Sequence, residues 1–189
     1  MALPAQLNVA LKEWQTVCDA LAAGRQIILL RKGGIYESAG EFQLEHPQFL
    51  LFPTHVHQNP AMLKPDQKVK KLTEEPRQIK IQFAAEITDI LPMPTRPAID
   101  ALNDQHIWTP PLIDMRFNYR PENPLYLLLV RTYILPHSEL IENTPAYAGC
   151  KSWVPLDNPV STQASKPALD DAQYSARHKL ILDRLQQTH

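Results

Sequence analysis

Cysteine and glycine are both scarce in this sequence, which contains 2 cysteines and 5 glycines among 189 residues. Two thiols, Cys18 and Cys150, are too few for a disulfide framework or for a zinc site made of thiolates. A reducing compartment therefore fits the sequence best, and we expect a cytoplasmic protein. The first residues have neither the basic start nor the apolar run of a secretion signal, which agrees with that expectation.

An excess of charge is also missing, because 19 lysines and arginines stand against 20 aspartates and glutamates. No overall field draws such a molecule to nucleic acid or to an anionic membrane, so any such binding needs a local patch. No segment approaches the roughly 18 consecutive apolar residues of a transmembrane helix. We expect no membrane association, and the sequence leaves the oligomeric state open.

Proline, in contrast, is abundant, with 18 residues. Proline interrupts helices and strand ladders and stiffens loops. We therefore expect few long regular elements, with short strands and irregular connections between them.

Apolar patterning predicts the main elements. Apolar residues recur at steps of three and four from residue 7 to residue 21, which predicts a helix that ends near Gly24. Alternation over 79–88 predicts a half-buried strand, and apolar runs at 26–30 and 125–135 predict strands buried on both faces. Together they predict an α+β fold with one mixed, mostly short-stranded sheet packed by the N-terminal helix.

The chain divides into three predicted parts. Residues 1–156 contain the apolar segments and form the globular α+β domain. Residues 157–167 are mostly polar and bury too little apolar area to offset ordering, which predicts a flexible linker. Residues 168–189 form a C-terminal helix with acidic residues first and basic residues later, and this helix is either docked or mobile.

Several stretches of the sequence resemble the domain-of-unknown-function family 1802. They are 11–14 (LKEW), 26–35 (QIILLRKGGI), 45–58 (EHPQFLLFPTHVHQ), 125–135 and 147–154 (YAGCKSWV). The resemblance runs through most of the chain up to about residue 156. The family has no assigned activity, so the resemblance implies kinship and carries over no functional residue.

Histidines provide the candidates for a metal site. His55 and His57 are two residues apart, so in an extended segment they share one face, where His46 or Glu45 could join them. Two imidazoles at this spacing are a weak signal, and hydrogen-bonded or surface histidines are the ordinary alternative. We therefore predict no metal and no cofactor, and keep the three histidines as candidate binding residues.

Signs of catalysis are few. Cys150 lies beside Lys151, a cation that could stabilise a thiolate, but no partner for nucleophilic catalysis is visible and an inert thiol is the ordinary interpretation. The sequence contains no serine nucleophile elbow, phosphate loop, dinucleotide-binding glycines or zinc-protease helix. These absences favour a protein that is not an enzyme.

Basic residues support a different idea. In an extended segment, Arg116 and Arg120 share one face while Phe117 and Tyr119 share the other, and such a ribbon can hold phosphates and stack bases. Four further cations near strand or loop ends could complete an anion-binding surface: Arg31, Lys32, Arg131 and Lys151. The alternative is a solvated face whose aromatic side lies in the core.

Two functions remain open. The first is a non-catalytic binding module for nucleic acid or for a protein partner. The second is a hydrolase or nuclease with a site assembled from scattered residues, namely Glu45, His46, His55, His57 and Arg131. The binding module is favoured because no catalytic constellation is apparent.

Overall fold

The computed structural model describes residues 3–32, 37–38, 41–42, 46–70, 72–93, 95–149 and 151–188. Its main sheet has seven strands, six of them in the order β2-β7-β6-β5-β1-β8, and the seventh, β9, also pairs with β7. The bounds are β1 Gln6–Trp14, β2 Ile28–Lys32, β5 Gln48–Thr54, β6 Gln78–Met93, β7 Leu125–Glu142, β8 Trp153–Ser161 and β9 Lys166–Pro167. Strands β3 (Glu37–Ser38) and β4 (Glu41–Phe42) form a separate antiparallel pair.

Four α-helices accompany the sheet within the described residues: α1 Gln15–Ala22, α2 Arg96–Asp100, α3 Pro110–Asn118 and α4 Asp171–Gln186. Three 3₁₀ turns lie at η1 Pro60–Met62, η2 Asn103–Gln105 and η3 Pro145–Tyr147. None of the helices in the described part of the chain is both long and apolar enough to cross a membrane.

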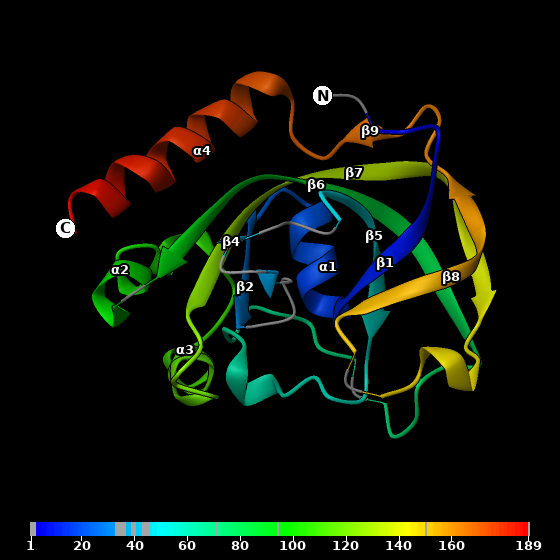
Figure 1. Ribbon diagram of the computed structural model, residues 1–189, viewed down its shortest axis with the longest axis horizontal. Helices are drawn as coiled ribbons and strands as arrows, with labels where there is room; N and C mark the ends of the chain where they lie inside the picture. Colours follow the sequence, from blue (N-terminus) through cyan, green and yellow to red (C-terminus); the bar gives the residue numbers. More distant parts are fainter. Residues whose placement is uncertain are drawn as a thin grey trace.

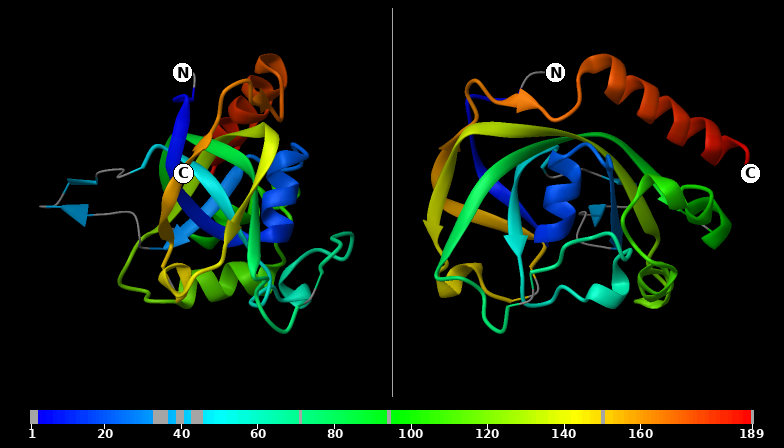
Figure 2. Two further views of the ribbon diagram at one scale, coloured as in Figure 1. Left: turned by 90° about the vertical axis from the view of Figure 1, so that its right-hand side faces the viewer. Right: turned by 180° about the vertical axis from the view of Figure 1, so that it is seen from behind.

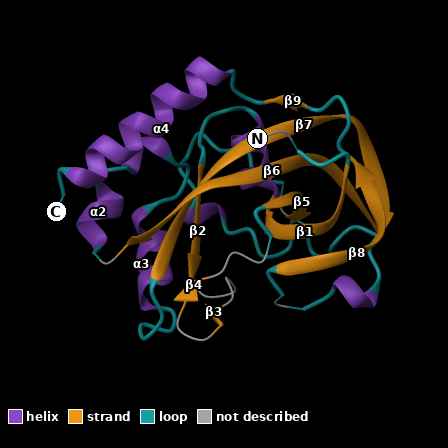
Figure 3. Cartoon of the chain, turned by 45° about the horizontal axis from the view of Figure 1, so that its top comes forward, coloured by secondary structure: helices purple, strands orange, loops and turns teal. Residues whose placement is uncertain are grey.

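The sheet is mixed, because β1 runs parallel to β5 while the other pairs in it are antiparallel. Strands β6 and β7 arch over α1, and α4 runs along the outside of this arch (Figures 1 and 2). Helices α2, α3 and α4 gather beside one end of the sheet, and β8 lies at the other end (Figure 3). The predicted α+β class, with a mixed sheet packed by an N-terminal helix, is confirmed.

Strands β6 and β7 are longer than the proline content predicts, with 16 and 18 residues. Their ladder shifts register between Ile81 and Phe83 and again between Ile87 and Asp89. Pro136 of β7 falls beside the first shift, where the ladder is broken and a missing N–H costs little. Pro136 is therefore accommodated within β7 without ending the strand.

The predicted N-terminal helix is wrong in its first half, because residues 6–14 form β1 and the helix begins at Gln15. Strand β1 lies between β5 and β8 and is buried on both faces, with Ala10 and Leu11 in different apolar clusters. A strand buried on both faces loses its alternation, so its apolar residues also fit the helical period. The predicted C-terminal end of the helix near Gly24 is confirmed, since α1 ends at Ala22 and Gly24 has the left-handed φ of +65°.

The polar segment predicted as a flexible linker is instead paired with the sheet. Strand β8 extends to Ser161 against β1, and β9 pairs with β7. Val160 is buried in an apolar cluster, while residues 157–159, 161 and 163 are exposed. A few well-spaced apolar side chains are therefore enough to hold this segment, and composition alone misses them.

The C-terminal helix α4 docks on the body of the protein. Tyr174 Oη lies 2.7 Å from Thr88 Oγ1, and His178 Nε2 lies 2.6 Å from Asp89 Oδ2. Arg177 donates to the carbonyl of Gly24 at the end of α1. Of the two alternatives left open by the sequence, the structure adopts the docked one.

Candidate anion-binding cleft

A cavity of about 740 Å³ opens where several strands end. Strands β1 and β5 are parallel, with Trp14 opposite Thr54, so both end at the same edge of the sheet and at this cavity. Arg116 of helix α3 and residues 143–145, 147–149, 151 and 152 supply further parts of the wall. Such a volume is typical of sites for small ligands.

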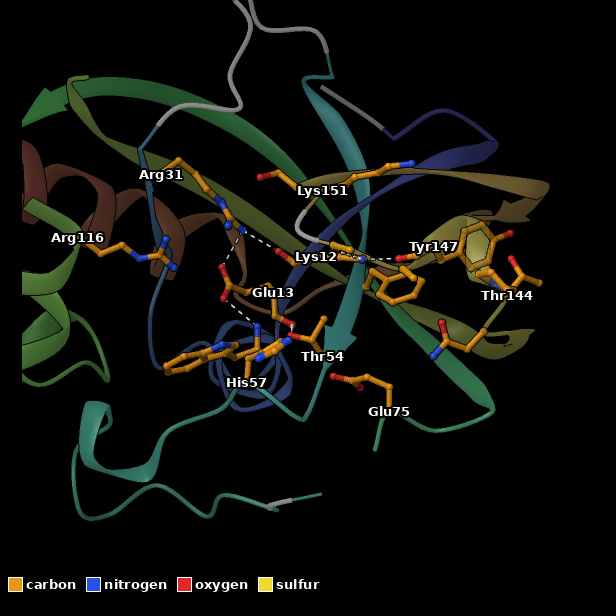
Figure 4. A pocket seen from close by; sticks show the side chains of 17 residues that line it. Lys12, Glu13, Arg31, Thr54, His57, Glu75, Arg116, Thr144, Tyr147 and Lys151 are labelled. Carbon is orange, nitrogen blue, oxygen red and sulfur yellow. Dashed lines mark hydrogen bonds and ion pairs between the residues drawn. The ribbon is translucent and has the colours of Figure 1, made fainter. Parts of the chain in front are cut away.

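An ion pair between Arg31 and Glu13 forms one end of the cavity (Figure 4). Arg31 Nη2 lies 2.7 Å from Glu13 Oε2 and also donates to the carbonyl of Lys12 at 3.1 Å. The Glu13 side chain is only 7% exposed and its other oxygen accepts from Trp14 N. Arg31 Nε is buried and has no hydrogen-bond partner among the described residues.

Arg116 reaches the same end of the cavity from the last turn of α3 (Figure 4). Its Nε is buried without a hydrogen-bond partner. Burial lowers the pKa of Arg116, and the nearby positive charge of Arg31 lowers it further. Two guanidinium groups thus face one carboxylate, Glu13, and one positive charge is left without a counter-charge.

Two lysines line the rest of the cavity. Lys12 Nζ donates to the carbonyls of Tyr147 and Gly149, which ties the wall formed by η3 to β1. Lys151 is exposed at the cavity. The described lining residues therefore include four cations, Lys12, Arg31, Arg116 and Lys151, against two carboxylates, Glu13 and Glu75, and this arrangement favours an anionic ligand.

The second carboxylate, Glu75, has a local structural contact. It accepts hydrogen bonds from the backbone N–H groups of His55 and Val56, each at 2.9 Å, and its Oε2 lies 3.3 Å from His55 Nδ1. This contact holds residues 55–57 in a turn, so His55 and His57 do not share the face of an extended segment as predicted. His57 is exposed and lines the cavity, whereas His55 does not.

The histidines do not form a metal cluster among the residues that the structure describes. His46 packs edge-on against Trp153, with ring centroids 5.1 Å apart, and does not line the cavity. No group of three metal-ligating side chains is present in this part of the chain. Glu45, the fourth proposed ligand, lies outside the described residues.

The predicted ribbon of cations and aromatics is wrong, because residues 110–118 form α3. Pro110 and Pro111 occupy the first helical positions, where a missing N–H costs nothing, and the extended interpretation missed this helix start. Arg116 and Arg120 consequently separate: Arg116 enters the cavity, while Arg120 has φ 45° and lies over the exposed ring of Tyr119.

Three other candidate positions lie elsewhere. Lys32 donates to the carbonyl of Phe117 and so ties β2 to the end of α3. Arg131 pairs with Asp171 at the start of α4. Cys150 lies outside the described residues. Of the nine candidate binding residues, the cavity gathers Arg31, His57, Arg116 and Lys151, and it leaves out Lys32, His46, His55, Arg120 and Arg131.

Several cavity residues were not predicted, among them Lys12, Glu13, Trp14 and Glu75. A signal for three of them was present, since the stretch 11–14 is one of those that carry the family resemblance. The stretch 147–154 likewise contributes Tyr147, Gly149 and Lys151 to the cavity. Four of the five stretches that carry the resemblance thus contribute residues to this site, and 125–135 does not.

A family model for the domain of unknown function DUF1802 matches residues 10–179. The chain belongs to the DUF1802 family. The match extends past residue 156, where the sequence resemblance was expected to end, and it includes β8 and the first half of α4. The cavity is therefore enclosed by residues of the DUF1802 domain.

Among solved structures, the chain is similar to the ASCH protein from Zymomonas mobilis, with 9% identity and a TM-score of 0.44 over 93% of each chain. It is also similar to two point mutants of that protein. The first mutant has 9% identity and a TM-score of 0.44, and the match covers 94% of this chain and 99% of the mutant chain. The second mutant has 10% identity and a TM-score of 0.43, and the match covers 91% of this chain and 96% of the mutant chain. No curated protein matches the chain.

Proposed function

We propose that this member of the DUF1802 family is a non-catalytic binding module whose ligand is nucleic acid, bound in the cavity beside Arg31 and Arg116. The observation that carries the proposal is the Arg116 guanidinium, which lines the cavity without an ion-pair or hydrogen-bond partner among the described residues. A desolvated cation without a counter-charge is costly, and an anionic ligand compensates that cost.

The other lining groups suit a nucleotide. Guanidinium groups bind phosphate through charge-assisted N–H donors, and both arginines line one end of the cavity. Trp14 is half-buried at the cavity, so part of its indole can contact a base. Thr144 and Ser152 add hydroxyl groups to the wall. The volume of about 740 Å³ accommodates one nucleotide with its neighbouring phosphate.

Binding of this kind is local. The whole chain has a formal net charge of −1, so its attraction for a polyanion comes from the cavity and not from the surface as a whole. Few phosphates would be neutralised, and the affinity should then fall only moderately with salt. Binding to a protein partner is the competing outcome.

The hydrolase or nuclease alternative has less support. Of its five proposed residues, His57 alone among those described lines the cavity. His46 packs on Trp153 and Arg131 pairs with Asp171, so the proposed set does not converge. Glu13, the most buried carboxylate of the cavity, is already held by Arg31 and by Trp14 N.

The direct test is a fluorescence anisotropy titration of a labelled single-stranded 10-nucleotide RNA, and of the matching DNA, at several salt concentrations. We expect saturable binding, with a log–log salt slope of about −0.7 for each phosphate neutralised. Lys151→Gln removes an exposed cavity cation and should weaken binding. Lys80→Gln, an exposed lysine of β6 outside the cavity, is the matched control. No binding of either oligonucleotide at low salt would overturn the proposal.

A further inference from the structure

We propose that the arginine end of the cavity binds a terminal phosphate, so that the protein recognises a phosphorylated end of a nucleic acid chain. This inference rests on the proposed function and specifies which part of the nucleic acid the site selects. Its basis is the juxtaposition of Arg31 from β2, Arg116 from α3 and the single carboxylate of Glu13.

Both arginines retain donors that the described protein does not use. Arg31 is only 9% exposed, and its Nε has no hydrogen-bond partner. The Nε of Arg116 is likewise buried without a hydrogen-bond partner. Buried polar groups are nearly always paired in proteins, and both of these orphaned donors belong to side chains that line the same cavity. A tetrahedral phosphate has enough oxygens to accept from both side chains together.

The donors lie at one end of the cavity. Figure 4 shows Arg31, Arg116 and Glu13 together at one end of the cavity, whereas Tyr147 and Thr144 lie at the opposite end. A phosphate bound between the arginines therefore leaves the rest of the cavity, including Trp14, for the sugar and base to which it is attached. A nucleotide at a chain end fits this arrangement, because its phosphate has only one nucleoside to accommodate.

Charge favours a terminal phosphate over a phosphodiester. Glu13 already accepts a charge-assisted hydrogen bond from Arg31, so it offers little compensation to Arg116. The two guanidinium groups repel each other, and this repulsion contributes to the lowered pKa of Arg116. A phosphomonoester carries about 1.5 to 2 negative charges near pH 7, whereas a diester in the chain carries one. The monoester relieves the repulsion more completely.

The experiment compares three labelled oligonucleotides of one sequence, with a 5′-phosphate, with a 3′-phosphate or with hydroxyl groups at both ends, and adds a nucleoside monophosphate and its nucleoside as competitors. We expect one phosphorylated end to bind about tenfold more tightly than the hydroxyl form, as for a charge-assisted hydrogen-bond pair. Arg116→Gln should abolish this preference. Arg116→Lys should retain part of it, because lysine keeps the positive charge but lacks the paired N–H donors of the guanidinium group. Arg120→Gln, which alters an exposed arginine beyond α3, should retain the full preference.

The outcomes separate the two proposals. Equal affinity for all three oligonucleotides overturns the terminal-phosphate site and leaves nucleic acid binding intact. If no oligonucleotide binds but the monophosphate does so through Arg116, the phosphate site stands and the nucleic acid function fails. If Arg116→Gln keeps the preference at unchanged melting temperature, the phosphate is bound elsewhere and the inference is wrong.

Discussion

The Glu13 carboxylate and the Arg31 guanidinium form a buried ion pair that joins two strands far apart in the sheet. Glu13 belongs to β1 and Arg31 to β2, and β5, β6 and β7 lie between these strands in the sheet order. Their atoms are nevertheless 2.7 Å apart, so the sheet curls until its β2 edge faces β1. This closure brings the cations of the cavity together.

Removing one member of this pair should destabilise the fold. Glu13→Ala leaves Arg31 buried beside Arg116 with no counter-charge, and breaking a buried pair in this way costs about 3 kcal/mol. Urea denaturation measures the change. The double variant Glu13→Leu with Arg31→Met should lose less than the two single changes together, because no buried charge is left unpaired. A loss below about 1 kcal/mol for Glu13→Ala would contradict the buried-pair assignment.

His106 should make stability depend on pH. Burial lowers the pKa of this 5%-exposed imidazole to about 4, the ammonium of Lys64 contributes, and Nδ1 accepts from Trp108 N at 3.2 Å. The unfolded value is near 6.5, so between about pH 6.5 and pH 4 the unfolded state binds more protons and stability falls as pH falls. From pH 7.5 to pH 5 the loss is about 2 kcal/mol.

Urea denaturation of wild type and His106→Gln at both pH values isolates this contribution. Glutamine retains an acceptor for Trp108 N but does not titrate. The free energy of unfolding of wild type minus that of the variant should therefore be larger at pH 7.5 than at pH 5. A difference that does not change with pH would show that His106 is not the titrating group.

A side chain at Gly24 should destabilise the protein. The φ of Gly24 is +65°, and a Cβ there would clash with the side chain of Leu169, on the segment leading into α4. Gly24→Ala should therefore destabilise by at least about 1 kcal/mol from backbone strain alone. Leu169→Ala removes the clash but not the backbone strain. In thermal melting, Gly24→Ala should therefore lower the melting temperature of the Leu169→Ala variant, but by less than it lowers that of wild type. Full tolerance of Gly24→Ala would exclude this close approach.

Arg131 should be dispensable for ligand binding, although the sequence made it a candidate. Its partner Asp171 is 88% exposed, and pairs of this kind contribute at most about 1 kcal/mol. Arg131→Gln should leave oligonucleotide affinity unchanged within about twofold, as expected for a residue outside the cavity. A tenfold loss of affinity at unchanged melting temperature would place the binding surface near α4 instead.

The sequence predicts elements whose burial differs between faces or whose apolar run is continuous. Strands β2, β6 and β7 are found for this reason, although β6 extends to Met93, beyond the alternating part. Strand β1 is missed because both of its faces are buried, and its apolar residues then fit a helix equally well.

The site is less predictable than the fold, because its residues come from segments that only the strand order brings together. Arg31 and Glu13 are 18 positions apart in sequence, and Arg116 lies a further 85 positions along the chain. Local pattern selects Arg116 as a binding cation but places it on an extended ribbon, because that interpretation overlooks Pro110 and Pro111 as a helix start. Convergence of charges depends on how the sheet curls, and no local signal encodes that.

The comparison of Arg116→Gln with Arg120→Gln tests the central claim most directly. Both variants remove one positive charge from nearby positions, but only Arg116 lines the cavity. Anisotropy titration with the oligonucleotide that binds wild type best should show about a tenfold loss for Arg116→Gln and less than a twofold change for Arg120→Gln, at equal melting temperatures. Equal losses for the two variants, or no loss for either, would contradict an anion-binding cleft at this site.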